Sequence, residues 1–297
     1  MRIAITGASG LLGSALAPAL SEDGHSVVRL VRREARDPGE SGWDPAAHRL
    51  DPTALDDVDA VVHLAGANIG GRRWSPAYKR ELVASRLDST TTLAAALAAA
   101  APRERVLLSA SGINWYGDTG ATAVDEAAPK GTGFLAELVA AWEGATRPAE
   151  DAGARVVHLR TSPVLARSGG LLAPVLPLFR AGLGGRLGSG QQYMPWIGLP
   201  DWVGAVRWLL TAGDVRGAVN LAAPDQVTNA EFTRTLARVL HRPAVLPVPA
   251  FALRLALDGL ADEGALVSIR AVPRVLTSGG YTFRHPDLGA ALGWATA

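Results

Sequence analysis

The sequence predicts an α/β fold: a doubly wound parallel sheet followed by a smaller C-terminal lobe. The first thirty residues pass from an apolar run through a glycine-rich turn and an apolar helical stretch to a second β-branched run. Further apolar runs of strand length alternate with helical stretches up to about residue 160. Parallel strands that are buried on both faces read as continuous hydrophobic runs, so this alternation indicates a sheet covered by helices.

We expect the sheet strands at residues 2–6, 27–31, 60–64, 105–109 and 156–159, and helices at 11–20, 76–101 and 134–149. After residue 160, proline and glycine become frequent, and we place a domain boundary near residue 168. The first domain is then 1–168 and the lobe 169–297, with 203–222 returning to the sheet. Thr228 and Glu231 form a capping box that opens a helix to about residue 240.

Composition excludes several classes of protein. With 297 residues, 48% hydrophobic, 19% charged and a net charge of +1, the chain is an ordinary globular protein rather than a disordered one. The lack of cysteine excludes disulfides and thiolate chemistry, and the six histidines show no metal-ligand spacing, so we predict no metal.

The same composition bounds the partners. The chain has no dense run of Lys and Arg of the kind that binds nucleic acid. Its longest apolar stretches are about half the roughly 20 residues that span a bilayer. We expect a cytoplasmic protein with a small-molecule substrate and neither a membrane nor a nucleic-acid partner, and a homodimer is left open.

The strongest local signal is the glycine turn after the first strand. Gly7, Gly10 and Gly13 lie between that strand and a helix. A dinucleotide pyrophosphate binds backbone N–H groups at a helix start, and glycines let the chain approach it without a clashing Cβ. A tight structural turn is the alternative, but the second strand at the expected distance favours a nucleotide site.

The end of the second strand indicates which nucleotide. Where an NAD enzyme places a carboxylate for the ribose hydroxyls, this chain has Arg32 and Arg33. Guanidinium groups suit a 2′-phosphate, which favours NADP (NADPH) over NAD. Glu34 follows immediately and is the alternative ribose ligand.

Several motifs together resemble the extended short-chain dehydrogenase/reductases. The turn reads Thr6-Gly7-Ala8-Ser9-Gly10-Leu11-Leu12-Gly13, and the segment from Asp59 to Ile69 is similar to the fourth-strand motif of an atypical subgroup, the epimerase family proteins. Further matches are Arg73-Trp74, Ser85-Arg86-Leu87-Asp88, Ser109-Ala110-Ser111, Trp142-Glu143, Pro195-Trp196-Ile197 and Thr228-Asn229-Ala230-Glu231-Phe232. The resemblance covers essentially the whole chain and implies an NADP-binding Rossmann domain with a substrate-binding lobe.

The resemblance also implies which residues contact the cofactor. They are Gly7, Ser9, Gly10, Leu11, Leu12, Gly13, Arg32, Arg33, Leu64, Ala65, Gly66, Glu81, Arg86 and Val164. By position, Leu64 and Ala65 pass under the cofactor and Val164 lies beside the nicotinamide. The alternatives are that Leu64 and Ala65 belong to the core and that Glu81 and Arg86 form a helix-surface pair.

Catalysis departs from the family pattern. Short-chain dehydrogenases usually exchange protons through a Tyr with a Lys four residues later, and no tyrosine of this chain has such a lysine. Ser111 matches the substrate-orienting serine of the family, although it could instead only terminate a strand. We assign proton transfer to water, Tyr116 or Glu137, the last on the condition that burial raises its pKa.

Two functions follow from this pattern. The first is an NADP-dependent reductase or epimerase that acts on a small carbonyl or hydroxyl substrate, with Ser111, Tyr116 and Glu137 as its candidate catalytic residues. The second is a non-catalytic NADPH-binding sensor or interaction protein, which the missing Tyr–Lys pair favours.

Overall fold

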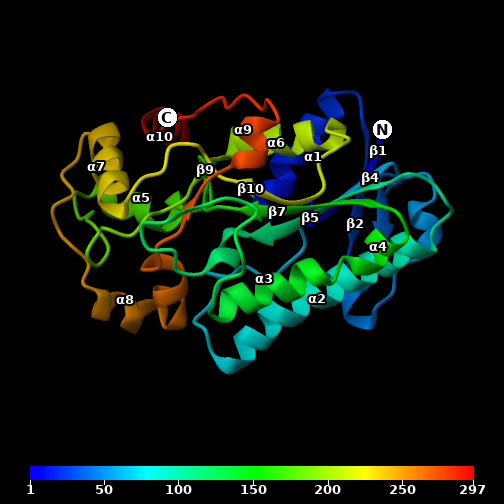
Figure 1. Cartoon of the computed structure of the whole chain (residues 1–297), viewed down its shortest axis with the longest axis horizontal. Coiled ribbons are helices and arrows are strands. Elements are labelled where there is room, and N and C mark those ends of the chain that lie inside the picture. The colour runs from blue at the N-terminus through cyan, green and yellow to red at the C-terminus, as the bar shows by residue number, and fades with distance from the viewer. The chain divides into compact units, whose positions relative to one another are not determined.

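The computed structural model describes residues 1–297 and contains a seven-stranded sheet, which confirms the predicted fold class (Figure 1). The strand order is β10-β7-β5-β4-β1-β2-β3. The strands are β1 (Arg2–Thr6), β2 (Ser26–Val31), β3 (Glu40–Gly42), β4 (Ala60–His63), β5 (Val106–Gly112), β7 (Arg155–Thr161) and β10 (Gly217–Leu221). The short β3 was not anticipated from the sequence, and β5 runs three residues beyond the expected end.

The strand order reverses at the centre of the sheet, between β1 and β4. β1 pairs in parallel with β2 on one side and with β4 on the other. Nucleotides bind beyond the carboxyl ends of the strands at such a switch point. Here those ends are Thr6, followed by the glycine turn, and His63, followed by Leu64.

Helices cover both faces of this sheet. Along the whole chain the helices are α1 (Leu11–Glu22), α2 (Pro76–Ala99), α3 (Phe134–Gly144), α4 (Arg147–Asp151), α5 (Leu172–Arg180), α6 (Leu199–Thr211), α7 (Asn229–Leu240), α8 (Ala250–Leu257), α9 (Arg274–Ser278) and α10 (Leu288–Thr296), and those from α7 onwards belong to the second unit described below. In Figure 1, α1 lies on one side of the strands and α2 and α4 lie on the other. No helix, including the 24-residue α2, is both long and apolar enough to cross a lipid bilayer.

The expected helix 134–149 is wrong in one respect, because it is two helices. α3 ends at Gly144 and α4 begins at Arg147, with Thr146 as its N-cap residue. Pro148 has no N–H to donate and is tolerated only in the first turn of a helix, so the chain restarts there. The break carries Thr146 and Glu150 to the neighbourhood of Glu143, which matters below.

The chain forms two compact units that interleave along the sequence. The first comprises 1–111, 138–159 and 206–218, and the second 112–137, 160–205 and 219–297. The first unit has its core around Leu30, Val61, Leu93 and Leu107. The core of the second unit lies around Trp196, Phe232 and Leu292. The domain boundary that the sequence places near residue 168 stays a prediction.

In the second unit, a distant carboxylate caps the start of α3. Glu263, in the π-helical turn η4 (Ala261–Ala265), accepts hydrogen bonds from the backbone N–H groups of Phe134 (3.0 Å) and Leu135 (2.6 Å). These N–H groups have no partner within the helix, so the carboxylate both satisfies them and complements the helix dipole. The capping box of Thr228 and Glu231 at α7 forms as predicted.

Candidate functional site

The turn between β1 and α1 leaves no room for side chains at its glycines. Gly7 has a φ of +68°, and a Cβ atom there would lie 2.8 Å from the carbonyl carbon of Leu64. A Cβ atom on Gly13 would lie 2.6 Å from Cα of Ala8. Gly10 caps α1 without any side-chain hydrogen bond, so the first N–H groups of the helix are left for an anion in front of the turn. Ser9, Leu11 and Leu12 belong to the same turn and first helical residues.

One buried hydroxyl joins this turn to the end of β4. The Thr6 hydroxyl oxygen accepts hydrogen bonds from the N–H groups of Leu64 (2.9 Å) and Ala65 (3.1 Å) and lies 2.7 Å from Nδ1 of His63. Since that oxygen already accepts twice, its own proton points to Nδ1. The imidazole proton is then on Nε2, which lies 3.0 Å from Oγ1 of Thr90.

Burial keeps His63 neutral in this network. Its side chain is fully buried, and desolvation lowers its pKa to about 3. A neutral imidazole can accept at Nδ1 and donate at Nε2 together, as the network requires. The backbone of Leu64 and Ala65 is therefore held against the glycine turn. This is the place where the family resemblance implies that the two residues contact the cofactor.

Arg86 brings a buried positive charge to the segment after β4. It donates hydrogen bonds to the carbonyl oxygens of Ala67 and Leu82, each at 3.1 Å, and its guanidinium carbon lies 4.9 Å from the centre of the Trp142 ring. A Cβ atom on Gly66 would be in contact with its side chain. Burial lowers the pKa of Arg86 to about 10, so it stays charged at neutral pH. Because its partners are carbonyl oxygens and an aromatic ring, the charge is available to an anionic group.

Glu81 and Val164 have other surroundings. Glu81, also on α2, is exposed and forms an ion pair with Arg72 (3.1 Å), so it does not pair with Arg86. Val164 is buried in the second unit, in strand β8 (Val164–Leu165) beside β9 (Ile197–Gly198). The expected cofactor contacts of both residues stay predictions.

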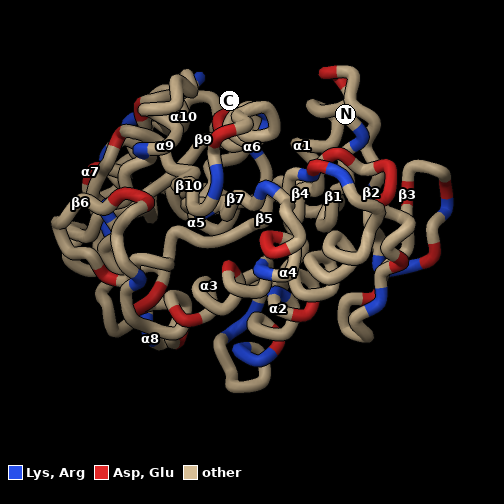
Figure 2. Tube along the Cα trace, turned by 45° about the vertical axis from the view of Figure 1, so that its right-hand side comes forward, with Lys and Arg blue, Asp and Glu red and all other residues tan.

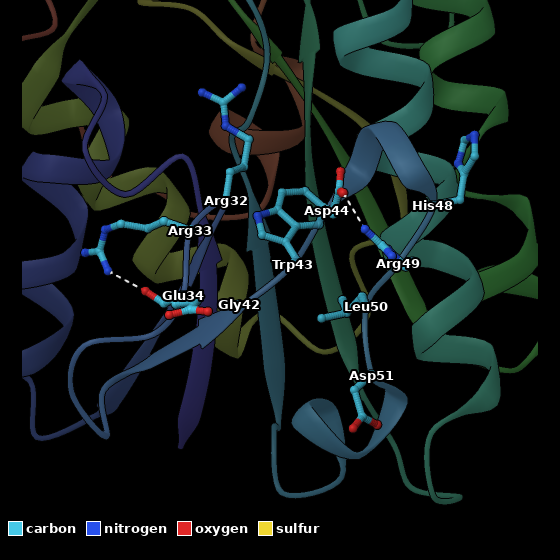
Figure 3. Close-up of a pocket in the computed structure, with 10 residues that line it drawn as sticks. All are labelled: Arg32, Arg33, Glu34, Gly42, Trp43, Asp44, His48, Arg49, Leu50 and Asp51. Carbon is cyan, nitrogen blue, oxygen red and sulfur yellow. Dashed lines mark hydrogen bonds and ion pairs between the residues drawn. The ribbon is translucent and has the colours of Figure 1, made fainter.

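An open hollow of about 670 Å³ lies beyond the end of β2 (Figure 3). Residues after β2 and after β3 line it, and in Figure 2 positive and negative segments alternate around these two strands. The lining residues are Arg32, Arg33, Glu34, Gly42, Trp43, Asp44, His48, Arg49, Leu50 and Asp51.

The arginines of this hollow differ in their partners. Arg33 donates to both carboxylate oxygens of Glu40 at 2.7 Å, and this pairing lowers the pKa of Glu40 to about 2. Arg49 pairs with Asp44 at 3.0 Å. Arg32 forms no ion pair, and Figure 3 shows its side chain directed away from Arg33 and Glu34. Of the two arginines expected to hold a 2′-phosphate, Arg32 is free to do so, whereas Arg33 must leave or share Glu40.

Ser111 is held by a carboxylate that the sequence analysis did not select. It lies near the carboxyl end of β5, is 5% exposed, and donates a 2.6 Å hydrogen bond to Oε1 of Glu143 on α3. The other carboxylate oxygen lies 3.9 Å from Nδ1 of His158 on β7. This pairing turns the serine hydroxyl into a group that can pass a proton to a neighbouring base.

Helical spacing was a signal that could have identified Glu143. It lies four residues after Val139 and seven after Ala136, both of which are buried, and so falls on the apolar stripe of α3. Glu137 is off that stripe. Its side chain is 66% exposed and forms an ion pair with Lys130, so the burial on which its candidacy depended is not met.

Tyr116 is buried and fully engaged in the second unit. Its hydroxyl donates to Oδ1 of Asn220 (2.7 Å) and accepts from Arg160 (3.1 Å). Burial raises the pKa of the phenol. A phenol with a raised pKa is a weaker acid than usual, and a catalytic role for Tyr116 stays a prediction.

The chain matches two family models. Residues 3–222 match the model of the NAD dependent epimerase/dehydratase family, and residues 248–295 match a domain of unknown function, DUF1731. The epimerase family protein Mb2239 of Mycobacterium bovis is 49% identical over 294 residues, which cover 99% of this chain and 97% of that protein. The epimerase family protein SDR39U1 of Homo sapiens is 36% identical over 295 residues, with 98% of each chain covered.

Solved structures are similar over the whole chain. The crystal structure of human epimerase family protein SDR39U1 (isoform2) with NADPH has a TM-score of 0.91 and 35% identity, covering 100% of this chain and 99% of that one. A nucleoside-diphosphate sugar epimerase from Corynebacterium glutamicum has a TM-score of 0.81 and 34% identity, covering 99% of this chain and 58% of that one.

Proposed function

Because this chain belongs to the NAD dependent epimerase/dehydratase family, we propose that it is an NADP-dependent reductase or epimerase acting on a small carbonyl or hydroxyl substrate. The observation that carries the proposal is the glycine turn: Gly7 and Gly13 let the chain pack tightly against Leu64 and Ala8, and the uncapped start of α1 leaves backbone N–H groups for a diphosphate. The human relative crystallised with NADPH supports the same choice of cofactor.

Three groups of residues in the first unit would hold NADPH. The turn from Gly7 to Gly13 would bind the pyrophosphate, and the segment after β4, with Arg86 beneath it, would lie along the cofactor. Arg32 would bind the 2′-phosphate in the hollow beyond β2, with Arg33 recruited from Glu40. When bound, NADPH supplies hydride to a carbonyl carbon, and NADP⁺ accepts it in reverse.

The protein contributes the proton. Ser111 Oγ donates its own proton to Glu143, so it would accept a hydrogen bond from the substrate hydroxyl, and the Glu143 carboxylate is in place to take the serine proton when that hydroxyl delivers its own. This pair stands in for the missing Tyr and Lys, since α3 carries neither residue. Glu143 thus replaces Glu137 in our assignment.

Cofactor choice is tested by calorimetric titration with NADPH and NADH. We expect NADPH to bind at least about tenfold more tightly, and Arg32→Ala to weaken NADPH about tenfold while leaving NADH unchanged. Arg33→Ala should have a smaller effect, because its guanidinium is already paired with Glu40. Equal affinities for the two nucleotides in the wild type would reject the choice of NADP.

A second function, NADPH binding without turnover, is favoured by the absence of Tyr and Lys from α3. Oxidation of NADPH against a panel of small aldehydes and ketones separates the two. An enzyme consumes NADPH with at least one carbonyl and loses this activity in Ser111→Ala, with NADPH affinity retained. An epimerase returns its hydride and consumes no NADPH in net, so hydroxyl substrates are also incubated with the NADP⁺-loaded protein and checked for inverted product. Tight NADPH binding with neither consumption nor inversion would instead support the sensor.

A further inference from the structure

A row of polar side chains connects Ser111 to the surface of the first unit. Ser111 Oγ donates to Oε1 of Glu143 at 2.6 Å, and Oε2 of Glu143 lies 3.9 Å from Nδ1 of His158. On the other side of the imidazole, Nε2 of His158 lies 3.0 Å from Oγ1 of Thr146 and 3.8 Å from Oε1 of Glu150. Each group can both take up and release a proton or a hydrogen-bonded hydrogen.

The two ends of this row differ in exposure, although Thr146 within it is fully buried. Ser111 is 5% exposed, and the side chains of Glu143 and His158 are 9% and 11% exposed. The Glu150 side chain at the far end is 42% exposed. The row therefore begins at a buried hydroxyl and ends at a carboxylate in water.

Thr146 bridges the last gap. Its hydroxyl oxygen lies 2.7 Å from the carbonyl oxygen of Glu143 and 3.2 Å from Oε1 of Glu150. One hydroxyl proton cannot serve both acceptors, so rotation about Cβ–Oγ moves it from the carbonyl to the carboxylate. In the second orientation, His158, Thr146 and Glu150 form a continuous hydrogen-bonded path.

We propose that Glu143, His158, Thr146 and Glu150 form a proton route between Ser111 and solvent. The proposal rests on the function proposed above. During oxidation of an alcohol, the substrate O–H bond breaks and its proton goes to Ser111 Oγ, while the serine proton goes to Glu143. Glu143 passes a proton to Nδ1 of His158 when movement of its carboxylate closes the 3.9 Å between them, and the ring releases a proton from Nε2 through Thr146 to Glu150 and water. The electron pair of the C–H bond leaves as hydride to NADP⁺, so the route carries one proton per turnover, and reduction runs it backwards.

Break points in α3 and α4 support the assignment. The chain leaves α3 at Gly144 and restarts at Arg147, which places Glu143, Thr146 and Glu150 around one imidazole. Thr146 is the N-cap residue of α4 but makes no capping hydrogen bond with its side chain, so its hydroxyl is left for His158 and Glu150. In this route His158 and Glu150 act through Glu143 and Ser111.

The first test needs neither cofactor nor substrate. In ¹⁵N-histidine-labelled apo protein, NMR measures how fast the His158 ring N–H exchanges with water. We expect Glu150→Gln and Thr146→Val each to slow this exchange about tenfold, because the outward path then lacks its acceptor or its bridge. Glu137→Gln is the matched control: it removes an exposed carboxylate of α3 that is outside the row and should leave the exchange rate unchanged.

The second test uses turnover on a carbonyl that the panel identifies. His158→Asn should lower kcat about tenfold with KM nearly unchanged, and added imidazole should restore part of the rate. Exchange that stays at the wild-type rate in Glu150→Gln overturns the route, whatever turnover shows. Slowed exchange without turnover on any carbonyl overturns the proposed function and leaves the route standing.

Discussion

Two regions of the molecule position their functional groups differently: the glycine turn after β1 and the cluster of polar side chains around Glu143. In the turn, the functional groups are backbone N–H groups, and close packing of Gly7 and Gly13 against main-chain atoms fixes them. In the cluster, the functional groups are side chains that arrive from β5, α3, α4 and β7. A backbone site tolerates almost no added atom, whereas a side-chain site fails when one polar partner is removed.

This difference is tested most severely by Gly13→Ala. The added methyl would lie 2.6 Å from Cα of Ala8, so the turn must open. We expect the free energy of unfolding to fall by roughly 2–4 kcal/mol. We also expect the variant to bind no NADPH at concentrations that saturate the wild type.

Gly24→Ala is the matched control for that variant. Gly24 also has a positive φ, +81°, but no atom lies within 4 Å of its would-be Cβ. It should lose only about 1 kcal/mol to backbone strain and keep its NADPH affinity. NADPH binding by Gly13→Ala at wild-type affinity would contradict a backbone-built cradle.

Thr6→Val should come next in size. Valine keeps the shape of threonine but leaves the N–H groups of Leu64 and Ala65 and Nδ1 of His63 without their partner. We expect a loss of roughly 2–4 kcal/mol by urea unfolding, together with weaker NADPH binding. Thr6→Ser retains the hydroxyl and should lose about 1 kcal/mol, so equal losses in the two variants would show that the methyl group, not the hydroxyl, is what matters.

His63 predicts a pH dependence of stability for the same region. Its native pKa of about 3 lies below the ordinary value of 6.5, so between these values the unfolded chain binds a proton that the native protein does not. Stability contributed by neutral His63 is complete above pH 6.5 and falls as the pH is lowered towards 3, by up to roughly 1.4 kcal/mol per pH unit. Urea unfolding between pH 7 and 4.5 measures this slope, and His63→Asn should reduce it. An identical slope in the variant would assign the effect to other groups.

The smallest effect is expected for Glu137→Gln. Its ion pair with Lys130 is exposed, and such pairs contribute less than about 0.5 kcal/mol. Both the free energy of unfolding and the turnover should stay close to wild type, in contrast to Glu143→Gln, which loses the acceptor of the Ser111 proton. A large loss of turnover in Glu137→Gln would return the proton-transfer role to that residue.

The sequence was informative where local backbone determines structure. Strand runs, the glycine spacing and the Thr228–Glu231 capping box predicted the sheet and its glycine turn, and the family that the motifs indicated is confirmed. Pairings between side chains were harder. Nothing in the chain order shows that Arg33 would be taken by Glu40, seven residues later, while Arg32 stays free. Likewise, Glu143 meets Ser111 only because α3 packs beside the end of β5, a tertiary contact across 32 residues.

Glu263 has a consequence for how the molecule is made. The carboxylate that caps α3 lies 129 residues after Phe134, within the segment that matches the domain of unknown function. During synthesis, the residues of α3 therefore leave the ribosome long before Glu263 does. Until then, the N–H groups at the start of the helix lack this carboxylate. A chain truncated before Glu263 contains the residues of all seven sheet strands but lacks this capping carboxylate. We therefore expect proteases to cleave truncated forms preferentially at the start of α3.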